Sequence, residues 1–130
     1  MATLVYDAGA LIAADRATPK FQTIHAASLR SGRAPLIPSG ALGQAWRDGR
    51  RQARLRRVLQ MCEIVPLDEY VARGAGVLCA RAGTSDVIDA SVVLLAVHRG
   101  AGVLTSDRGD IEKLVDALEP GIRKPPIFDI

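Results

Sequence analysis

Short apolar runs alternate with longer helical patterns along this sequence, and this alternation constrains the fold more than any other feature. Each run is almost continuously apolar, which is typical of a strand buried on both faces of a sheet. Strands separated by helices indicate a mostly parallel sheet whose two faces are covered by helices. The predicted strands are 2–6, 34–38, 63–67, 102–106 and, as a last edge strand, 125–130.

Helical patterns fill the segments between these strands, so the expected fold class is α/β. At 130 residues the chain is long enough to bury one substantial core, and we expect a single domain over 1–130. The glycines Gly49 and Gly83 are positions where a helix can break or stop. The predicted helices run from about residue 9, then over 20–31, 41–60, 68–83, 85–99 and 110–118.

The composition excludes several classes of protein. No run approaches the ~20 apolar residues that a membrane helix needs, and the first residues lack the basic region of a signal peptide. We therefore expect a cytoplasmic protein without a membrane role. Cys62 and Cys79 have no metal-type spacing, and we expect both to be reduced thiols in the core. No GxxxxGK[ST] or GxGxxG loop follows a strand, which disfavours an NTPase and a dinucleotide enzyme.

Positive charge is concentrated in one segment. The chain carries a net charge of +3, but residues 47–57 alone hold six arginines against one aspartate. This segment is either a solvated helix face or a site for phosphates or an acidic protein, because clustered arginines suit both. Aromatic residues make up only 4% of the chain, so base stacking is not a major mode of recognition. The candidate contacts to phosphates or to an acidic protein partner are Arg47, Arg50, Arg51 and Arg54.

Aspartates follow the predicted strands at their carboxyl ends, where parallel sheets bind ligands. Asp7 comes directly after the first strand, and Asp107 and Asp110 follow the strand 102–106. Each has an ordinary alternative role, because an aspartate at the start of a helix can cap it. Together they predict a cluster of like charges that a cation would have to compensate. An all-oxygen cluster suits Mg²⁺ or Mn²⁺, so the residues alone indicate a metal-dependent enzyme acting on phosphate groups.

Asp89 adds a fourth carboxylate to this edge of the sheet. On a helix it shares its face with Val92, Val93 and Ala96, so it lies on a stripe that is otherwise expected to be buried. The polar residues Ser91 and His98 fall on the opposite side of the same helix. Asp86, at the start of this helix, is expected either to cap it or to support Asp89.

Three motifs resemble a known family. The segments VYDAGALIA, SDVIDASVVLLA and VLTSDRGDIEKL occur in the order and spacing of a PIN domain, and they are most similar to the VapC-type ribonuclease toxins of bacterial toxin–antitoxin pairs and their actinobacterial relatives. The resemblance covers nearly the whole chain. It implies a three-layer α/β/α sandwich around a mostly parallel sheet, and endoribonuclease activity with Mg²⁺ or Mn²⁺. It also implies RNA as the substrate, a homodimer, and a VapB-like antitoxin as the partner.

The same resemblance assigns roles to individual acids. Asp7 matches the first metal-binding acid of the family, and Asp89 matches the acid that precedes an Ala-hydrophobic run. Asp107 and Asp110 both occupy positions where the family places its last acid. We expect Asp107 to bind the metal, because it is nearer the strand, and Asp110 to cap the helix that follows. Asp86 is expected to support the site from one helical turn before Asp89.

The resemblance breaks at Gln44, where the family usually has a Glu on the helix after the second strand. A glutamine can ligate a metal through its carbonyl oxygen, but it brings no negative charge and cannot act as a general base. Two functions therefore stay open: a metal-dependent endoribonuclease with Gln44 in a supporting role, or a catalytically weakened PIN domain that binds RNA or protein. The hydroxyl of Thr105 either holds a carboxylate or a metal-bound water, or belongs to an ordinary residue at the end of a strand.

Overall fold

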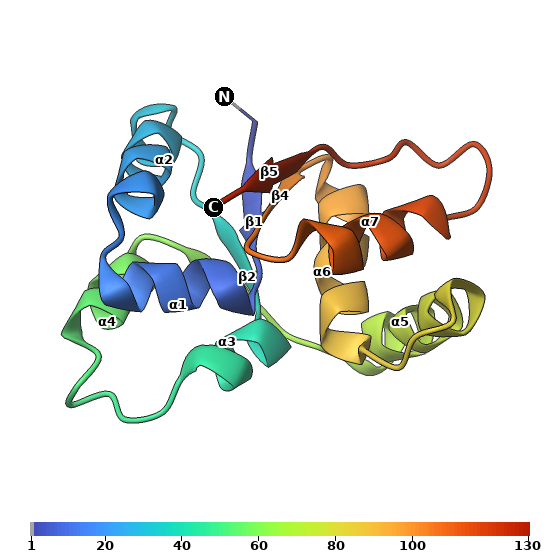
Figure 1. Ribbon diagram of the computed structural model, residues 1–130, viewed down its shortest axis with the longest axis horizontal. Coiled ribbons are helices and arrows are strands. Elements are labelled where there is room, and N and C mark those ends of the chain that lie inside the picture. The colour runs from blue at the N-terminus through green and yellow to red at the C-terminus, as the bar shows by residue number, and fades with distance from the viewer. Residues whose placement is uncertain (1) are drawn as a thin grey trace.

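A computed structural model describes residues 2–130, which form a parallel sheet surrounded by helices (Figure 1). The strands are β1 (Leu4–Tyr6), β2 (Leu36–Pro38), β3 (Glu63–Val65), β4 (Gly102–Thr105) and β5 (Ile127–Asp129). Their order in the sheet is β3-β2-β1-β4-β5, and every neighbouring pair is parallel. All five predicted strands are present, and the last of them does form an edge.

Seven helices in residues 2–130 cover the sheet. They are α1 (Ala8–Arg16), α2 (Pro19–Arg30), α3 (Ser39–Ala45), α4 (Ala53–Gln60), α5 (Glu69–Ala82), α6 (Val87–Arg99) and α7 (Arg108–Asp116). Figure 1 shows α1, α2 and α4 on one side of the sheet and α5, α6 and α7 on the other. The predicted three-layer α/β/α arrangement is therefore confirmed. No helix among residues 2–130 is both long and apolar enough to cross a bilayer.

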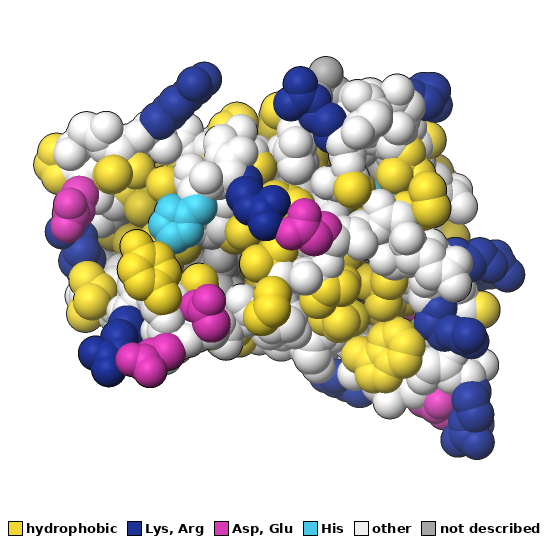
Figure 2. Space-filling view, turned by 180° about the vertical axis from the view of Figure 1, so that it is seen from behind, with side chains coloured by type: hydrophobic (Ala, Val, Ile, Leu, Met, Phe, Trp, Pro, Cys, Tyr) yellow, Lys and Arg dark blue, Asp and Glu magenta, His cyan; other side chains and the backbone are white. Residues whose placement is uncertain are grey.

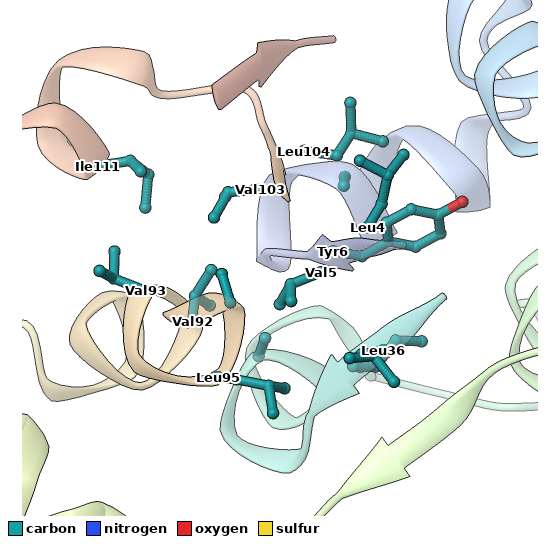
Figure 3. Close-up of a cluster of buried hydrophobic side chains, with 14 of the residues drawn as sticks. Leu4, Val5, Tyr6, Leu36, Val92, Val93, Leu95, Val103, Leu104 and Ile111 are labelled. Carbon is teal, nitrogen blue, oxygen red and sulfur yellow. The ribbon is translucent and has the colours of Figure 1, made fainter. Parts of the chain in front are cut away.

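The side chains of the central strands alternate between the two helical layers. Val5 of β1 and Val103 of β4 point toward α6, where Val92 and Val93 meet them (Figure 3). Tyr6, next along β1, points to the other layer, where its ring packs edge-on against Phe21 of α2. All of these side chains are fully or almost fully buried, because a parallel sheet between two helical layers has no wet face.

The predicted helical segment 41–60 is divided into α3 and α4, with the break around Gly49 where the sequence allowed one. The buried side chain of Gln52 organises the connection between them. Its amide oxygen accepts the backbone N–H groups of Arg47 at 2.8 Å and Asp48 at 3.1 Å, and its amide nitrogen donates to the carbonyl of Ala45 at 3.0 Å. These bonds replace those of a continuous helix, so the chain turns here.

Helix α6 is buried more completely than its sequence pattern suggests. Ser91 was predicted on a polar face, but only 2% of it is exposed. The prediction was wrong because α6 is packed between the sheet and α5 (Figure 1), so that most of its circumference meets protein. The Ser91 hydroxyl donates to the carbonyl of Ile88 at 2.6 Å, which satisfies it without water. His98, the next-to-last residue of α6, is exposed as predicted.

Both cysteines are free thiols, as the sequence predicted. Cys79 is buried and Cys62 is half-buried, with its sulfur 3.1 Å from the carbonyl oxygen of Val58. Burial raises the pKa of Cys62 to about 12, so the thiol stays protonated and unreactive at neutral pH.

Candidate functional site

Aspartates from three segments of the chain approach one another at the carboxyl edge of the sheet. Strands β1 and β4 are neighbours, so the residues that follow them emerge side by side. Asp7 follows β1 directly, and Asp107 follows β4 after one residue. Helix α6 begins at the same edge and brings Asp89 in its first turn. Their charges influence one another, so the structure brings these predicted site residues together at one edge of the sheet.

Asp7 is the most deeply placed of these acids, with 4% of its surface exposed. Its carboxylate caps α1 by accepting the backbone N–H of Ala10 at 2.8 Å. Burial raises the pKa of Asp7, and hydrogen bonds from the Thr105 hydroxyl and from backbone N–H groups oppose this rise. The nearby charge of Asp107 raises the pKa further. Asp7 is therefore a fixed, partly desolvated carboxylate with another negative charge beside it.

Asp89 has the most perturbed carboxyl group of the site. Burial raises its pKa to about 7, and the adjacent carboxyl of Asp86 contributes the next largest part of the rise. The charges of Asp7 and Asp110 act in the same direction. Asp86 itself is exposed and caps α6, accepting the backbone N–H of Asp89 at 2.9 Å. Both alternatives for Asp86 are thus met, since it caps the helix and lies against Asp89.

The expectation that Asp110 caps the last helix was wrong. Asp107 occupies the N-cap position of α7, yet its side chain makes no capping hydrogen bond. Asp110 lies in the first turn, and its contact with the carboxyl of Asp107 raises its pKa. The sequence pattern did not indicate this because the backbone conformation at Asp107, rather than residue type, decides which side chain reaches a free N–H.

Thr105 connects two of the acids. Its side chain is fully buried at the end of β4, where the hydroxyl oxygen accepts the backbone N–H of Asp107 at 2.9 Å. The same hydroxyl hydrogen bonds to the carboxylate of Asp7 and lowers its pKa. A hydroxyl can donate one bond and accept others, so Thr105 serves both neighbours at once. Of the two interpretations of Thr105, the structure favours the one in which it holds a carboxylate.

Gly9 has a role that the sequence reasoning missed. A Cβ atom at this position would overlap the side chain of Ser106 and lie 3.4 Å from Oδ1 of Asp7. The start of α1 and the β4–α7 connection therefore approach as closely as they do because residue 9 has no side chain. The signal in the sequence was a glycine two residues after the first acid.

The aspartates provide only oxygen donors, which is the donor type that Mg²⁺ and Mn²⁺ prefer. Among residues 2–130, no three His, Cys, Asp or Glu side chains are already arranged to hold one ion. Mg²⁺ usually binds through one or two carboxylates and keeps several waters. The residues that could bind such an ion are Asp7, Asp89 and Asp107, with Asp86 and Asp110 beside them.

Gln44 lies on α3, and its side chain is exposed. It lines an open hollow of about 530 Å³ beside α1, together with Arg16, Arg47 and Arg51. No hydrogen bond within residues 2–130 joins Gln44 to the aspartates. The place of the usual family glutamate is therefore filled by a neutral side chain that borders basic residues.

All six arginines of residues 47–57 are exposed. Arg50 pairs with Asp48, with 3.3 Å between Nε and Oδ1, and Arg47 donates to the backbone carbonyls of Gly43 and Trp46. Arg51 and Arg54 form no ion pair within residues 2–130. Figure 2 shows Lys and Arg side chains gathered on this part of the surface, at the lower right. The charge is thus available to a partner rather than neutralised internally.

Comparison with known proteins places the chain by its fold. No family model and no curated protein matches the sequence. The structure is similar to that of a chain of VapBC2 from Rickettsia felis bound to a DNA fragment from their promoter, with a TM-score of 0.69 and 12% identity over 98% of both chains. It is also similar to a chain of DNA-bound VapBC from Salmonella typhimurium, with a TM-score of 0.67 and 19% identity over 99% of this chain and 98% of that chain. These similarities confirm, at the level of the fold, the resemblance that the three motifs indicated.

Proposed function

We propose that this chain is a VapC-type PIN-domain endoribonuclease that hydrolyses RNA with Mg²⁺ or Mn²⁺ held by Asp7, Asp89 and Asp107. One observation carries the proposal: at the carboxyl edge of the sheet, burial, the adjacent Asp86 and the charges of Asp7 and Asp110 from other segments together raise the pKa of Asp89 to about 7. A cluster of this kind is unfavourable for the folded chain alone and becomes favourable with a cation. The likeness to chains of VapBC structures over nearly the full length supports the same conclusion.

The donor set fits a divalent ion. Asp7 is held by Thr105 and by backbone N–H groups, so one ligand is preorganised. Asp107 is exposed and makes no capping bond, so its carboxylate is available as a second ligand. When bound, the ion neutralises charge on the phosphate and lowers the pKa of a water molecule.

The residues of the chain have distinct tasks in this proposal. Thr105 keeps Asp7 in place, because its hydroxyl bonds both that carboxylate and the backbone of Asp107. Asp89 contributes a carboxylate whose pKa is raised in the metal-free chain, so a cation that neutralises the cluster is favoured there. Asp86 and Asp110 add negative charge that favours binding of a cation.

The basic segment supplies the contact to the substrate. We assign Arg47, Arg51 and Arg54 to phosphates of the RNA backbone, because they are exposed and carry no internal ion pair in residues 2–130. Arg50, already paired with Asp48, contributes less. A VapB-like antitoxin is a proposed protein partner, because the similar structures are of VapBC assemblies. A second copy of the chain is proposed as a partner from the resemblance of the motifs alone.

The competing function is a catalytically weakened PIN domain that binds RNA without cutting it. Gln44 favours it, because this side chain brings no charge to a site whose relatives are expected to have a glutamate. It also lies among basic residues rather than in hydrogen-bonding contact with the aspartates.

Incubation of the purified chain with mixed cellular RNA separates the two functions. Wild type is compared with Asp7→Asn and Gln44→Glu in Mg²⁺, Mn²⁺ or EDTA. Asn is as good a helix cap as Asp, so Asp7→Asn should keep α1 intact while removing a charge. Asp68→Asn is the matched control, because Asp68 caps α5 in the same way, with Oδ1 2.9 Å from the N–H nitrogen of Val71.

Cleavage that requires a metal, survives in Asp68→Asn and is lost in Asp7→Asn is the expected result. Activity that appears only in Gln44→Glu would establish the weakened binding module instead. Cleavage that is equal in Asp7→Asn and wild type would reject the proposed site.

A further inference from the structure

We infer that α1 and the start of α2 carry a phosphate-binding track, centred on Arg16 of α1 and Lys20 of α2, that holds single-stranded RNA leading away from the carboxylate site. This inference rests on the proposed function and names where the substrate runs. The residues 16 and 20 lie outside the arginine-rich segment that the sequence singled out. Four steps lead to it: the shape of the surface, its charge, its chemistry and its distance from Asp7.

Two open hollows flank the exposed side of α1, and they share a border. The first, of about 530 Å³, is lined on its far side by Gln44, Arg47 and Arg51. The second, of about 310 Å³, is lined by residues that include Gly9, Thr18, Lys20 and Ser106. Ile12 and Arg16 line both hollows. Four residues apart, they lie on the same helix face, so the hollows meet across these two side chains.

The two hollows carry more positive than negative charge. Arg16, Lys20, Arg47 and Arg51 line them, and none of the four forms an ion pair within residues 2–130. The acidic side chains in their lining are Asp15 and Asp48, and Asp48 is already paired with Arg50. Ile130 also lines the second hollow, and the pKa of the neighbouring Asp129 is lowered by its hydrogen bond to Arg108 and, to a lesser extent, by the charge of Lys20. The surface therefore keeps a positive excess that is free to bind an anion.

The chemistry of the lining favours a phosphate backbone over other anionic ligands. No aromatic side chain lines either hollow, so nothing stacks on bases there. Ile12 is the one large apolar side chain that is shared between them, which gives little surface to anchor a peptide. Exposed guanidinium and ammonium groups with neighbouring hydroxyls are typical contacts to phosphate oxygens, and they carry no sequence preference.

The track begins at the proposed site of cleavage. Gly9 and Ser106 line the second hollow, and they adjoin Asp7 and Asp107 in the chain. Helix α1 is nine residues long, so its axis extends about 13 Å from the Asp7 end to Arg16 at 1.5 Å per residue. Stacked single strands advance about 3.4 Å per nucleotide, so Arg16 lies up to about four nucleotides from the cut bond.

We expect Arg16 and Lys20 to strengthen the binding only of RNA that is long enough to reach them. Binding is measured by fluorescence anisotropy in EDTA, with one oligoribonucleotide that covers only the cut bond and another that extends about four nucleotides beyond it on both sides. The variants are Arg16→Gln and Lys20→Gln. Arg30→Gln is the matched control, because Arg30 is also an exposed arginine in the last turn of its helix but lines neither hollow.

Arg16→Gln should weaken binding of the long oligonucleotide several-fold and reduce the slope of log affinity against log salt by about 0.7, the value for one phosphate contact to a single strand. The short oligonucleotide should bind unchanged, and Arg30→Gln should behave as wild type. Equal losses on both lengths, or no loss on either, would overturn the inference. So would a loss of binding to an acidic peptide, such as oligoglutamate, without a loss of RNA binding.

Cleavage of the same oligonucleotides in Mg²⁺ separates this inference from the proposed function. If wild type cleaves both lengths and Arg16→Gln is equally active on both, the result supports the nuclease and rejects the track. If wild type cleaves neither length but Arg16→Gln still weakens binding of the long oligonucleotide, the result rejects the nuclease and supports the track.

Discussion

Replacement of Asp89 by Asn should remove a pH-dependent cost from the folded protein. Burial, with the neighbouring Asp86 and the charges of Asp7 and Asp110, raises the pKa of Asp89 from 3.8 to about 7. In the unfolded chain this carboxyl titrates near its ordinary value. Between these two pH values the folded chain binds more protons than the unfolded chain, so its stability falls as the pH rises. The cost is absent below about pH 4 and complete above about pH 7.

The size of the effect follows from the same change in pKa. The rise from 3.8 to about 7 corresponds to roughly 4 kcal/mol if water does not screen the charge. Asp89 is only half-buried, so screening should reduce the cost to about 1–2 kcal/mol. Asp89→Asn keeps the size of the side chain and cannot ionise, and it should gain this amount relative to wild type between pH 4 and pH 8.

Urea unfolding in EDTA at a series of pH values measures this gain. The control is Asp116→Asn, at an exposed position of α7 outside the cluster. Its pH dependence should match that of wild type, whereas the Asp89→Asn curve should lie progressively higher as the pH rises. Parallel curves for Asp89→Asn and wild type would refute the reasoning, because they would mean that folding does not raise the pKa of Asp89.

Three further substitutions test the packing around the site. Thr105→Val should lower the free energy of unfolding by about 1–3 kcal/mol in urea and reduce RNA cleavage, because it leaves the carboxylate of Asp7 without its hydroxyl donor; unchanged stability would mean that the bond contributes nothing. Leu55→Ala should cost about 2–5 kcal/mol in the same assay, since this side chain is fully buried, and a smaller loss would place α4 outside the cooperative core. Gly9→Ala should reduce cleavage, because its Cβ would overlap the side chain of Ser106. The double variant Gly9→Ala with Ser106→Gly should regain part of the cleavage activity. If it regains none, the overlap with Ser106 is not the cause of the loss.

The sheet could be predicted from the sequence because its signal is local. The five strands are short apolar runs separated by helical patterns, and both features depend on hydrophobic spacing alone. The parallel direction of the strands followed from the helices that separate them in the sequence. Helix α6, which comes directly before β4, is one example. The placement of Asp7 and Asp107 at one edge then followed from the rule that parallel strands share their carboxyl ends.

Details that depend on tertiary contacts could not be predicted in the same way. The pattern of α6 did not indicate that Ser91 is buried, because burial there results from α5 covering the helix. The sequence allowed a break near Gly49, but it did not indicate that the amide of Gln52 organises that break by bonding to the backbone of residues 45–48. The position of Asp107 rather than Asp110 at the N-cap depends on backbone angles. The basic pair Arg16 and Lys20 becomes visible only when the hollows beside α1 are formed.

Direct binding of Mn²⁺ tests the central claim, that Asp7, Asp89 and Asp107 form a metal site. Electron paramagnetic resonance measures free Mn²⁺ during a titration of the purified chain at pH 8, with Asp7→Asn, Asp89→Asn and the control Asp116→Asn alongside. The account predicts a saturable site in wild type and in Asp116→Asn that Mg²⁺ displaces, and loss of that site in both Asp7→Asn and Asp89→Asn. Wild type without saturable binding, or equal affinity in all four proteins, would contradict it.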